Sequence, residues 1–316
     1  MVRSRLLPIL LCCLISAGAA AGDHPLAPIE IAVGPHQRSL RLFAPDGLGP
    51  GAPLLLLFHG SSDSGAGFRR GTGGEFDRLA AEHGFAVAYL DGYKGNWNDC
   101  RLADPFPART EQIDDIAFVE AVIRLGRERL GSDPRKVLAV GFSNGASMVY
   151  RLALERPDLV AGIAAIGGNL PARENMICRE AGKPVAALIL SGTEDPLVPY
   201  QGGDVTIFGR NSRGRVISSE ESAAYFARLN GLDEDPREED WPVRVDDGTR
   251  IRLRDWAAPG KPPVELLTVV GGGHVVPQAE FRFPAILGRQ SANLDAPLAV
   301  WDFFERALAV QPPLAP

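Results

Sequence analysis

The chain has 316 residues, an apolar fraction of 45% and a net charge of −6, from 33 Lys and Arg against 39 Asp and Glu. This acidic balance argues against a nucleic-acid-binding protein, which would present a basic face, and it gives no reason to expect attraction to an anionic membrane surface. The 35 glycines and 26 prolines are more than a helical bundle would carry. The composition therefore favours a loop-rich α/β protein, and the chain is long enough for a sizeable core.

The first 21 residues have the pattern of a secretory signal peptide. Basic residues precede an apolar run at 6–15, and small residues follow at 16–22. Two Ala-x-Ala cleavage sites, at 17–19 and 19–21, are suitable. The apolar run is shorter than the roughly 20 residues that cross a membrane. We therefore expect residues 1–21 to be removed and the mature protein to be secreted, either extracellular or periplasmic, with no membrane partner afterwards.

Removal of the signal peptide would leave two cysteines, Cys100 and Cys178. In an oxidising compartment two cysteines most often form one disulfide, and two unrelated buried thiols are the alternative. Neither cysteine has a partner at the spacing of zinc ligands. The sequence therefore predicts no metal site.

Residues 22–316 contain no internal repeat and no low-complexity linker, so we expect them to form a single domain. Apolar residues alternate at 29–33 and 40–42 around a Gly-Pro turn, which predicts an antiparallel hairpin at the start. Short continuous apolar runs then indicate strands that are buried on both faces. These runs lie at 54–58, 85–90, 136–142, 160–166, 185–190 and 264–270.

Helical patterns alternate with these strands. Apolar residues recur at steps of three and four from Ile116 to Leu130, and two aspartates precede them, as suits a helix N-terminus. Further helices are expected from Ser143 to Pro157, at 220–229 and at 297–308. Strands that alternate with helices predict an α/β fold with a mostly parallel central sheet and helices on both faces.

The polar segment 233–263 interrupts this alternation before the last strand. It contains an Asp247-Gly248 turn, with Val243 and Val245 on one side and further alternating apolar residues on the other. This pattern is typical of a β-hairpin. We expect the segment to be a hairpin excursion from the core.

The sequence Gly141-Phe142-Ser143-Asn144-Gly145 is a G-x-S-x-G motif between a predicted strand and a predicted helix. This is the context of the nucleophile elbow, a turn so tight that glycine is needed on both sides of the serine. The turn would hold the Ser143 hydroxyl above the sheet. An ordinary strand-to-helix turn with a capping serine is the alternative.

A serine hydroxyl becomes an effective nucleophile when a base takes its proton. After a nucleophile elbow the acid and the histidine follow in that chain order, and His274 is the single histidine beyond Ser143. Asp195, directly after the predicted strand 185–190, is the best candidate for the acid that orients the imidazole. Its neighbour Glu194 is an alternative.

Other acids in this interval, Asp204 and Asp240, are weaker candidates because no predicted strand end places them. Two backbone N–H groups would stabilise the oxyanion. We expect one from Asn144 and the other from the loop after strand 54–58, on Ser61 or alternatively Ser62. His59 in this loop precedes the nucleophile, and we expect it to form hydrogen bonds within the loop.

At these residues the sequence resembles the polyhydroxybutyrate depolymerase-like esterases, a group that includes feruloyl and acetylxylan esterases. The similarity spans residues 58–277, and the matching stretches are FHGSSDSG, DDIAFVEAVI, GFSNGASM, LSGTEDPLVPYQGG and VVGGGHVVP. The resemblance implies an α/β-hydrolase fold and an exported ester hydrolase. It also implies that Ser143 is the nucleophile, Asp195 the acid and His274 the base, and that the two cysteines pair.

We therefore expect a secreted serine carboxylesterase that needs no cofactor and acts on a small or oligomeric ester. Two substrate classes compete: a 3-hydroxyalkanoate ester or oligomer, as for a polyhydroxybutyrate depolymerase, and a feruloyl or acetyl ester of plant polysaccharide. Peptidase activity on the same residues and a non-catalytic α/β-hydrolase binding protein are the remaining alternatives. No nucleic-acid partner is expected, and the sequence leaves the oligomeric state open.

Overall fold

The computed structural model describes residues 25–310, so the predicted signal peptide lies outside the described residues. The strands are β1 (Pro28–Val33), β2 (His36–Phe43), β3 (Leu54–Phe58), β4 (Ala86–Leu90), β5 (Val137–Phe142), β6 (Gly162–Ile166), β7 (Ala186–Gly192), β8 (Gly203–Asp204), β9 (Arg215–Val216), β10 (Arg237–Asp240), β11 (Arg250–Trp256) and β12 (Val264–Val270). The helices are α1 (Gly65–Gly71), α2 (Glu75–His83), α3 (Pro107–Thr110), α4 (Asp115–Leu130), α5 (Asn144–Glu155), α6 (Ser219–Leu229) and α7 (Ala296–Ala309), and short 3₁₀ turns are η1 (Pro157–Leu159), η2 (Arg173–Asn175) and η3 (Ala285–Leu287).

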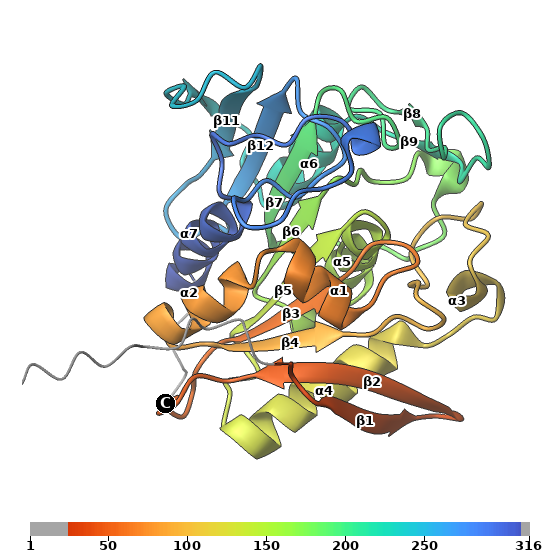
Figure 1. Cartoon of the computed structure of the whole chain (residues 1–316), viewed down its shortest axis with the longest axis vertical. Helices are drawn as coiled ribbons and strands as arrows, with labels where there is room; N and C mark the ends of the chain where they lie inside the picture. Colours follow the sequence, from red (N-terminus) through yellow and green to blue (C-terminus); the bar gives the residue numbers. More distant parts are fainter. Residues whose placement is uncertain (1–24, 311–316) are drawn as a thin grey trace, which may run out of the picture.

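The main sheet has ten strands in the order β1-β2-β4-β3-β5-β6-β7-β12-β11-β10 (Figure 1). The central strands from β4 to β12 are parallel to one another. Antiparallel strands lie at both edges of the sheet, with β1 and β2 on one side and β10 and β11 on the other. The carboxyl ends of the central strands therefore meet along one edge, where the loops of an α/β protein form its site.

Two apolar clusters lie on opposite faces of this sheet. Successive side chains of β3 alternate between them, as the pleat requires. One cluster packs the sheet against α4, α5 and α6, with Phe118 and Phe226 fully buried. The other packs it against α1, α2 and α7, with Phe76 and Phe303 fully buried. The predicted fold class, a mostly parallel sheet with helices on both faces, is confirmed.

The predicted strands and the four predicted helices are present with small differences at their ends. The opening hairpin is present as β1 and β2. Sequence analysis missed α1 and α2, which connect β3 to β4. Both are short and bordered by glycine, with Gly74 before α2 and Gly84 after it in left-handed conformations. Their helical period is too brief to stand out, so packing on the sheet determines them.

The expectation for segment 233–263 was partly wrong. A hairpin is present, but β10 and β11 extend the main sheet beside β12 instead of leaving the core. The strand before the turn is Arg237–Asp240, and the expected strand residues Val243 and Val245 are exposed. Cross-strand ion pairs explain the register: Arg252 lies 3.0 Å from Asp240, and Arg254 lies 2.8 Å from Glu238.

A disulfide joins Cys100 and Cys178, which are 78 positions apart in the sequence. It links the segment after β4 to the segment after η2. Between residues 25 and 310, no helix is long and apolar enough to cross a membrane.

Candidate active site

Ser143 occupies a strained turn between β5 and α5. Its backbone has φ +55° and ψ −116°, a region that residues other than glycine rarely adopt. A Cβ atom on Gly141 would collide with the carbonyl oxygen of Gly145, and one on Gly145 would collide with the carbonyl oxygen of Phe58. Both glycines of the motif are therefore required by close approach of the backbone, as a nucleophile elbow demands.

His274 and Asp195 are brought together by neighbouring parallel strands. Asp195 follows β7 and His274 follows β12, and these two strands pair in register. The Nδ1 atom of His274 lies 2.6 Å from Oδ2 of Asp195, and the side chains are 4% and 2% exposed. The carboxylate can only accept, so Nδ1 carries the hydrogen and Nε2 keeps its lone pair. This is the tautomer that a general base requires.

The second oxygen of Asp195 is also held. Its Oδ1 atom accepts hydrogen bonds of 2.8 Å from the backbone N–H groups of Leu197 and Val198. The carboxylate orientation is thus determined by the loop as well as by the imidazole.

The other acids considered from the sequence lie elsewhere. Glu194 is exposed and pairs with Arg289 at 3.0 Å. Asp204 is exposed in β8, and Asp240 is exposed in β10, where it pairs with a β11 arginine. Among these candidates the structure brings Asp195 alone to His274.

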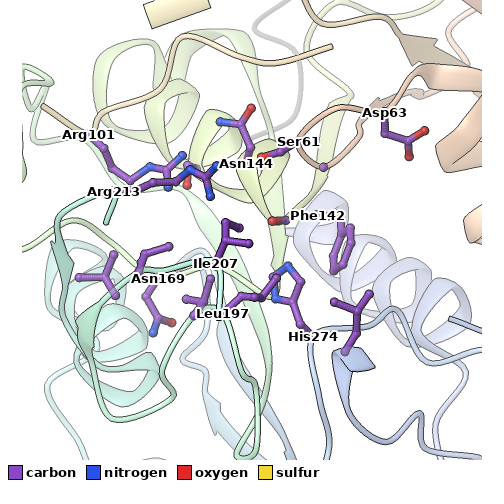
Figure 2. A pocket seen from close by; sticks show the side chains of 18 residues that line it. Ser61, Asp63, Arg101, Phe142, Asn144, Asn169, Leu197, Ile207, Arg213 and His274 are labelled. Atoms are coloured by element: carbon purple, nitrogen blue, oxygen red, sulfur yellow. The ribbon is translucent and has the colours of Figure 1, made fainter. Parts of the chain in front are cut away.

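Ser143 and His274 line one pocket together with Phe142, whose ring centroid is 4.9 Å from that of His274 (Figure 2). Within residues 25–310 no hydrogen bond of 3.5 Å or less joins the Ser143 and His274 side chains. Hydrogen bonds between catalytic groups are often long without substrate and tighten when it binds. The pocket is therefore lined by a serine and by an imidazole whose Nδ1 is hydrogen-bonded to a carboxylate.

Both residues expected to supply oxyanion N–H groups, Ser61 and Asn144, line this pocket. Asn144 begins α5, and its side chain is occupied elsewhere: Oδ1 accepts from the Trp97 N–H at 2.8 Å and Nδ2 donates to Asp99 at 2.7 Å. Its backbone N–H is what remains for the pocket. Ser61 lines the pocket, whereas the N–H of Ser62 donates to the carbonyl of Gly95 at 2.8 Å. The geometry thus favours Ser61 over Ser62.

His59 holds the loop that carries Ser61. Its Nε2 atom accepts a 2.9 Å hydrogen bond from the Gly92 N–H, so Nδ1 donates to the Gly60 carbonyl at 2.6 Å. Burial lowers the pKa of His59, which favours this neutral form. The expectation that His59 forms hydrogen bonds within its loop is confirmed. The indole of Trp97 adds a 2.9 Å hydrogen bond to the His59 carbonyl.

The pocket is a cavity of about 250 Å³ with an apolar side and a basic end. The apolar side is formed by Leu197, Val198, Val205, Ile207, Val216 and Leu287. The basic end is formed by Arg101 and Arg213. Sequence analysis missed both arginines, since no motif marks them; the available signal was that Arg101 directly follows a cysteine of the predicted disulfide.

A buried charge cluster supports the basic end. Arg101 forms an ion pair with Asp99, and its guanidinium also lies 3.4 Å from the carboxylate of Asp104. Asp99 accepts a further hydrogen bond from the side chain of Asn144. Burial, together with the negative charge of Asp99, raises the pKa of Asp104 to about 7. In the part of the chain that the structure describes, no group of three or more His, Cys, Asp and Glu residues could hold a metal ion.

The sheet and the elbow at its carboxyl edge define the class of α/β-hydrolases. The pattern of the phospholipase/carboxylesterase family matches residues 89–207. The chain is also 34% identical over 284 residues to a protein of Nocardia uniformis subsp. tsuyamanensis named "Putative esterase NocK", covering 87% of this chain and 81% of that protein. The chain belongs to this esterase family of α/β-hydrolases and is a hydrolase of carboxylic esters.

More distant similarities agree. Feruloyl esterase B of Piromyces equi is 25% identical over 228 residues, which are 71% of this chain and 39% of that protein, so the similarity covers well under half of that relative. The acetyl xylan esterase from Aspergillus awamori superposes with a TM-score of 0.57 and 16% identity over 80% of this chain and 95% of that one. At this identity the second likeness supports the fold alone.

Proposed function

We propose that this esterase is a secreted serine carboxylesterase in which Ser143 is the nucleophile, His274 the base and Asp195 the acid. One observation carries the proposal: the buried 2.6 Å hydrogen bond between His274 and Asp195 orients the imidazole in the pocket that also contains the Ser143 elbow. A nucleophile and a base that line one pocket, with an acid hydrogen-bonded to the base, are the arrangement of an activated serine.

The reaction has two halves. As the Ser143 hydroxyl attacks the ester carbonyl, His274 Nε2 takes its proton, and the oxyanion accepts hydrogen bonds from the N–H groups of Asn144 and Ser61. The bond to the leaving alcohol then breaks, and His274 gives the proton to that alcohol. Water attacks the acyl-enzyme in the same way, releases the carboxylic acid and restores Ser143. No cofactor takes part in these steps.

Two substrate classes are proposed. The first is a 3-hydroxyalkanoate ester or oligomer, as for a polyhydroxybutyrate depolymerase, and the aliphatic side chains along one wall of the pocket support it. The alternative is a feruloyl or acetyl ester of plant polysaccharide, which is supported by the relative named feruloyl esterase B. A panel of poly(3-hydroxybutyrate), methyl ferulate and acetylated xylan compares the two directly.

Secretion is part of the proposal. The disulfide between Cys100 and Cys178 supports it, because such bonds persist in oxidising compartments and are rare in the cytosol. The mass of the protein recovered from culture medium or periplasm tests both export and removal of residues 1–21.

Covalent labelling by a fluorophosphonate probe tests the nucleophile. We expect the unmodified protein to be labelled at one serine and Ser143→Ala to be unlabelled. Ser147→Ala is the matched control, because Ser147 lines the same pocket one helical turn later; it should be labelled to completion. Equal labelling of Ser143→Ala and the unmodified protein would exclude the proposed mechanism.

A further inference from the structure

The basic end of the pocket has no part in the proposed steps. Arg101 and Arg213 both line the pocket. Figure 2 shows their side chains extending into it from the side away from Phe142 and His274. Two guanidinium groups at one end of a small cavity, whose lining also includes one acidic residue, Asp63, require an explanation, because like charges repel and burial of a charge is costly.

The two arginines are not equivalent. Arg101 is neutralised by Asp99 and Asp104. Among the described residues Arg213 has no carboxylate within 4.0 Å, and its Nε atom is buried without a hydrogen-bond partner. Its guanidinium lies 4.5 Å from the centroid of the Phe106 ring, which supports its face and leaves its edge unpaired. Arg213 is therefore a half-buried cation whose donors lack an anion.

The charge balance points the same way. Burial lowers the pKa of Arg213 and the positive charge of Arg101 lowers it further, whereas the negative charges of Asp104 and Asp99 raise it. An arginine still keeps its proton at neutral pH, so the unfavourable charge remains. A bound anion would offset both effects.

Asn175 ties together the two backbone segments that carry the arginines. The side chain of Asn175 accepts a 3.0 Å hydrogen bond from the Ala103 N–H, beside Arg101, and donates to the carbonyls of Arg213 and Arg215 at 3.2 and 3.1 Å. One residue thus ties together the two segments that carry the guanidinium groups. Backbone segments that are already tied together lose less conformational entropy when a ligand binds.

We propose that Arg213, with Arg101 beside it, binds a carboxylate of the substrate, so that the enzyme prefers short esters that carry a free carboxylate near the ester bond. This rests on the proposed function, since the pocket is that of Ser143. The planar guanidinium edge matches a carboxylate with two parallel hydrogen bonds. A cavity of about 250 Å³ limits the separation between ester and carboxylate to a few carbon atoms. The acid end of a 3-hydroxyalkanoate oligomer has this chemistry.

Matched substrate pairs test the proposal. One pair places the charge on the alcohol: the linear dimer of 3-hydroxybutyrate and its neutral carboxamide. The other places it on the acyl group: monomethyl glutarate and methyl pentanoate. We expect a higher kcat/KM for the anionic member of at least one pair, and this preference should fall with added salt because the interaction is ionic.

Arg213→Gln should lower kcat/KM for the preferred anionic ester about tenfold or more, mainly through KM, and change the neutral member less than twofold. Arg213→Lys, which keeps the charge but not the fork, should retain part of the preference. Arg210→Gln is the matched control, because Arg210 is an exposed residue of the same loop outside the pocket lining. It should preserve the preference.

Inhibition gives a readout that does not need turnover of the test esters. Free 3-hydroxybutyrate should inhibit hydrolysis of 4-nitrophenyl acetate competitively, and about tenfold more weakly in Arg213→Gln. If Arg213→Gln unfolds at a lower temperature than the unmodified protein, the same comparison of anionic and neutral esters is made with Arg213→Lys. Equal kcat/KM within both pairs, or no inhibition by the carboxylate, would overturn the carboxylate site and leave the esterase mechanism intact. The esterase mechanism is tested separately, because it would be excluded if the fluorophosphonate probe labelled Ser143→Ala as it labels the unmodified protein.

Discussion

At the scale of single residues, the orientation of the Asp195 carboxylate decides what His274 can do. Two backbone N–H groups hold one carboxylate oxygen, so the other oxygen faces Nδ1 of His274. The imidazole is thereby held with Nε2 free to accept a proton. The catalytic capacity proposed for Ser143 requires this tautomer.

Asp195→Asn should therefore lower kcat by about 10³- to 10⁴-fold with a small change in KM. The amide oxygen would keep the two backbone donors, so the amide NH₂ would face Nδ1 and force the hydrogen onto Nε2. Steady-state kinetics on a short nitrophenyl ester measures the effect. The control is Glu194→Gln, an adjacent exposed acid that pairs with Arg289, and it should keep the unmodified rate. Comparable losses in both variants would contradict the assignment.

At the scale of elements, the loop after β4 and the loop between β8 and β9 build the pocket's basic end, because the first carries Arg101 and the second carries Arg213. The disulfide between Cys100 and Cys178 joins the loop after β4 to the segment after η2, and Asn175, the last residue of η2, donates to the carbonyls of Arg213 and Arg215. The loop after β4 also carries Asp99, whose carboxylate accepts a hydrogen bond from the side chain of Asn144, the first residue of α5. The disulfide thus stabilises a region in direct contact with the proposed oxyanion site.

Loss of this disulfide should reduce the free energy of unfolding by about 2–4 kcal/mol, because the bond closes a long loop in the unfolded chain. Urea unfolding of the protein with and without reductant measures the change. The double variant Cys100→Ser/Cys178→Ser provides the control, since its unfolding curve should not respond to reductant. An unfolding midpoint that reductant leaves unchanged in the unmodified protein would show that the bond contributes little.

At the scale of the whole molecule, the sheet is open and has antiparallel strands at both edges. The outermost strand β10 consists of charged, exposed residues, which oppose pairing with another chain. The central strands are buried on both faces, so nearly all charge lies outside the two apolar clusters. Asp104, buried beside Asp99 and Arg101, is an exception, and it links stability to pH.

Asp104→Asn should become more stable than the unmodified protein as the pH rises. The carboxyl of Asp104 has an ordinary pKa of 3.8, raised to about 7 in the folded protein. Between these values the folded state binds more protons than the unfolded state, so stability falls with rising pH. Asparagine mimics the protonated acid and removes this loss. We expect similar unfolding free energies near pH 4 and an advantage of about 1 kcal/mol or more for the variant at pH 8.

Urea unfolding across this pH range provides the measurement. Exposed Asp233 serves for comparison, because Asp233→Asn should leave the pH dependence as it was. A difference between Asp104→Asn and the unmodified protein that stays constant from pH 4 to pH 8 would exclude titration of Asp104 as its cause.

The features that the sequence determined by itself are local. The apolar runs at 54–58 and 264–270 coincide with β3 and β12, because strands that are buried on both faces are rich in apolar residues. The glycines around Ser143 mark the elbow, because a Cβ at either position would meet backbone. His274 could be proposed because it is the single histidine beyond Ser143, and Asp195 because it follows a predicted strand between Ser143 and His274.

Only the tertiary structure decided which distant segments share a surface. It placed β10 and β11 on the sheet edge, where ion pairs between strands determine their register, and it supported α1 and α2 by packing where their own period was too short. It also brought Arg101 and Arg213 together at one end of the pocket. Neither arginine belongs to a periodic pattern or a motif. Their partnership depends on loop positions held by Asn175 and the disulfide, and such long-range contacts leave no trace in local sequence.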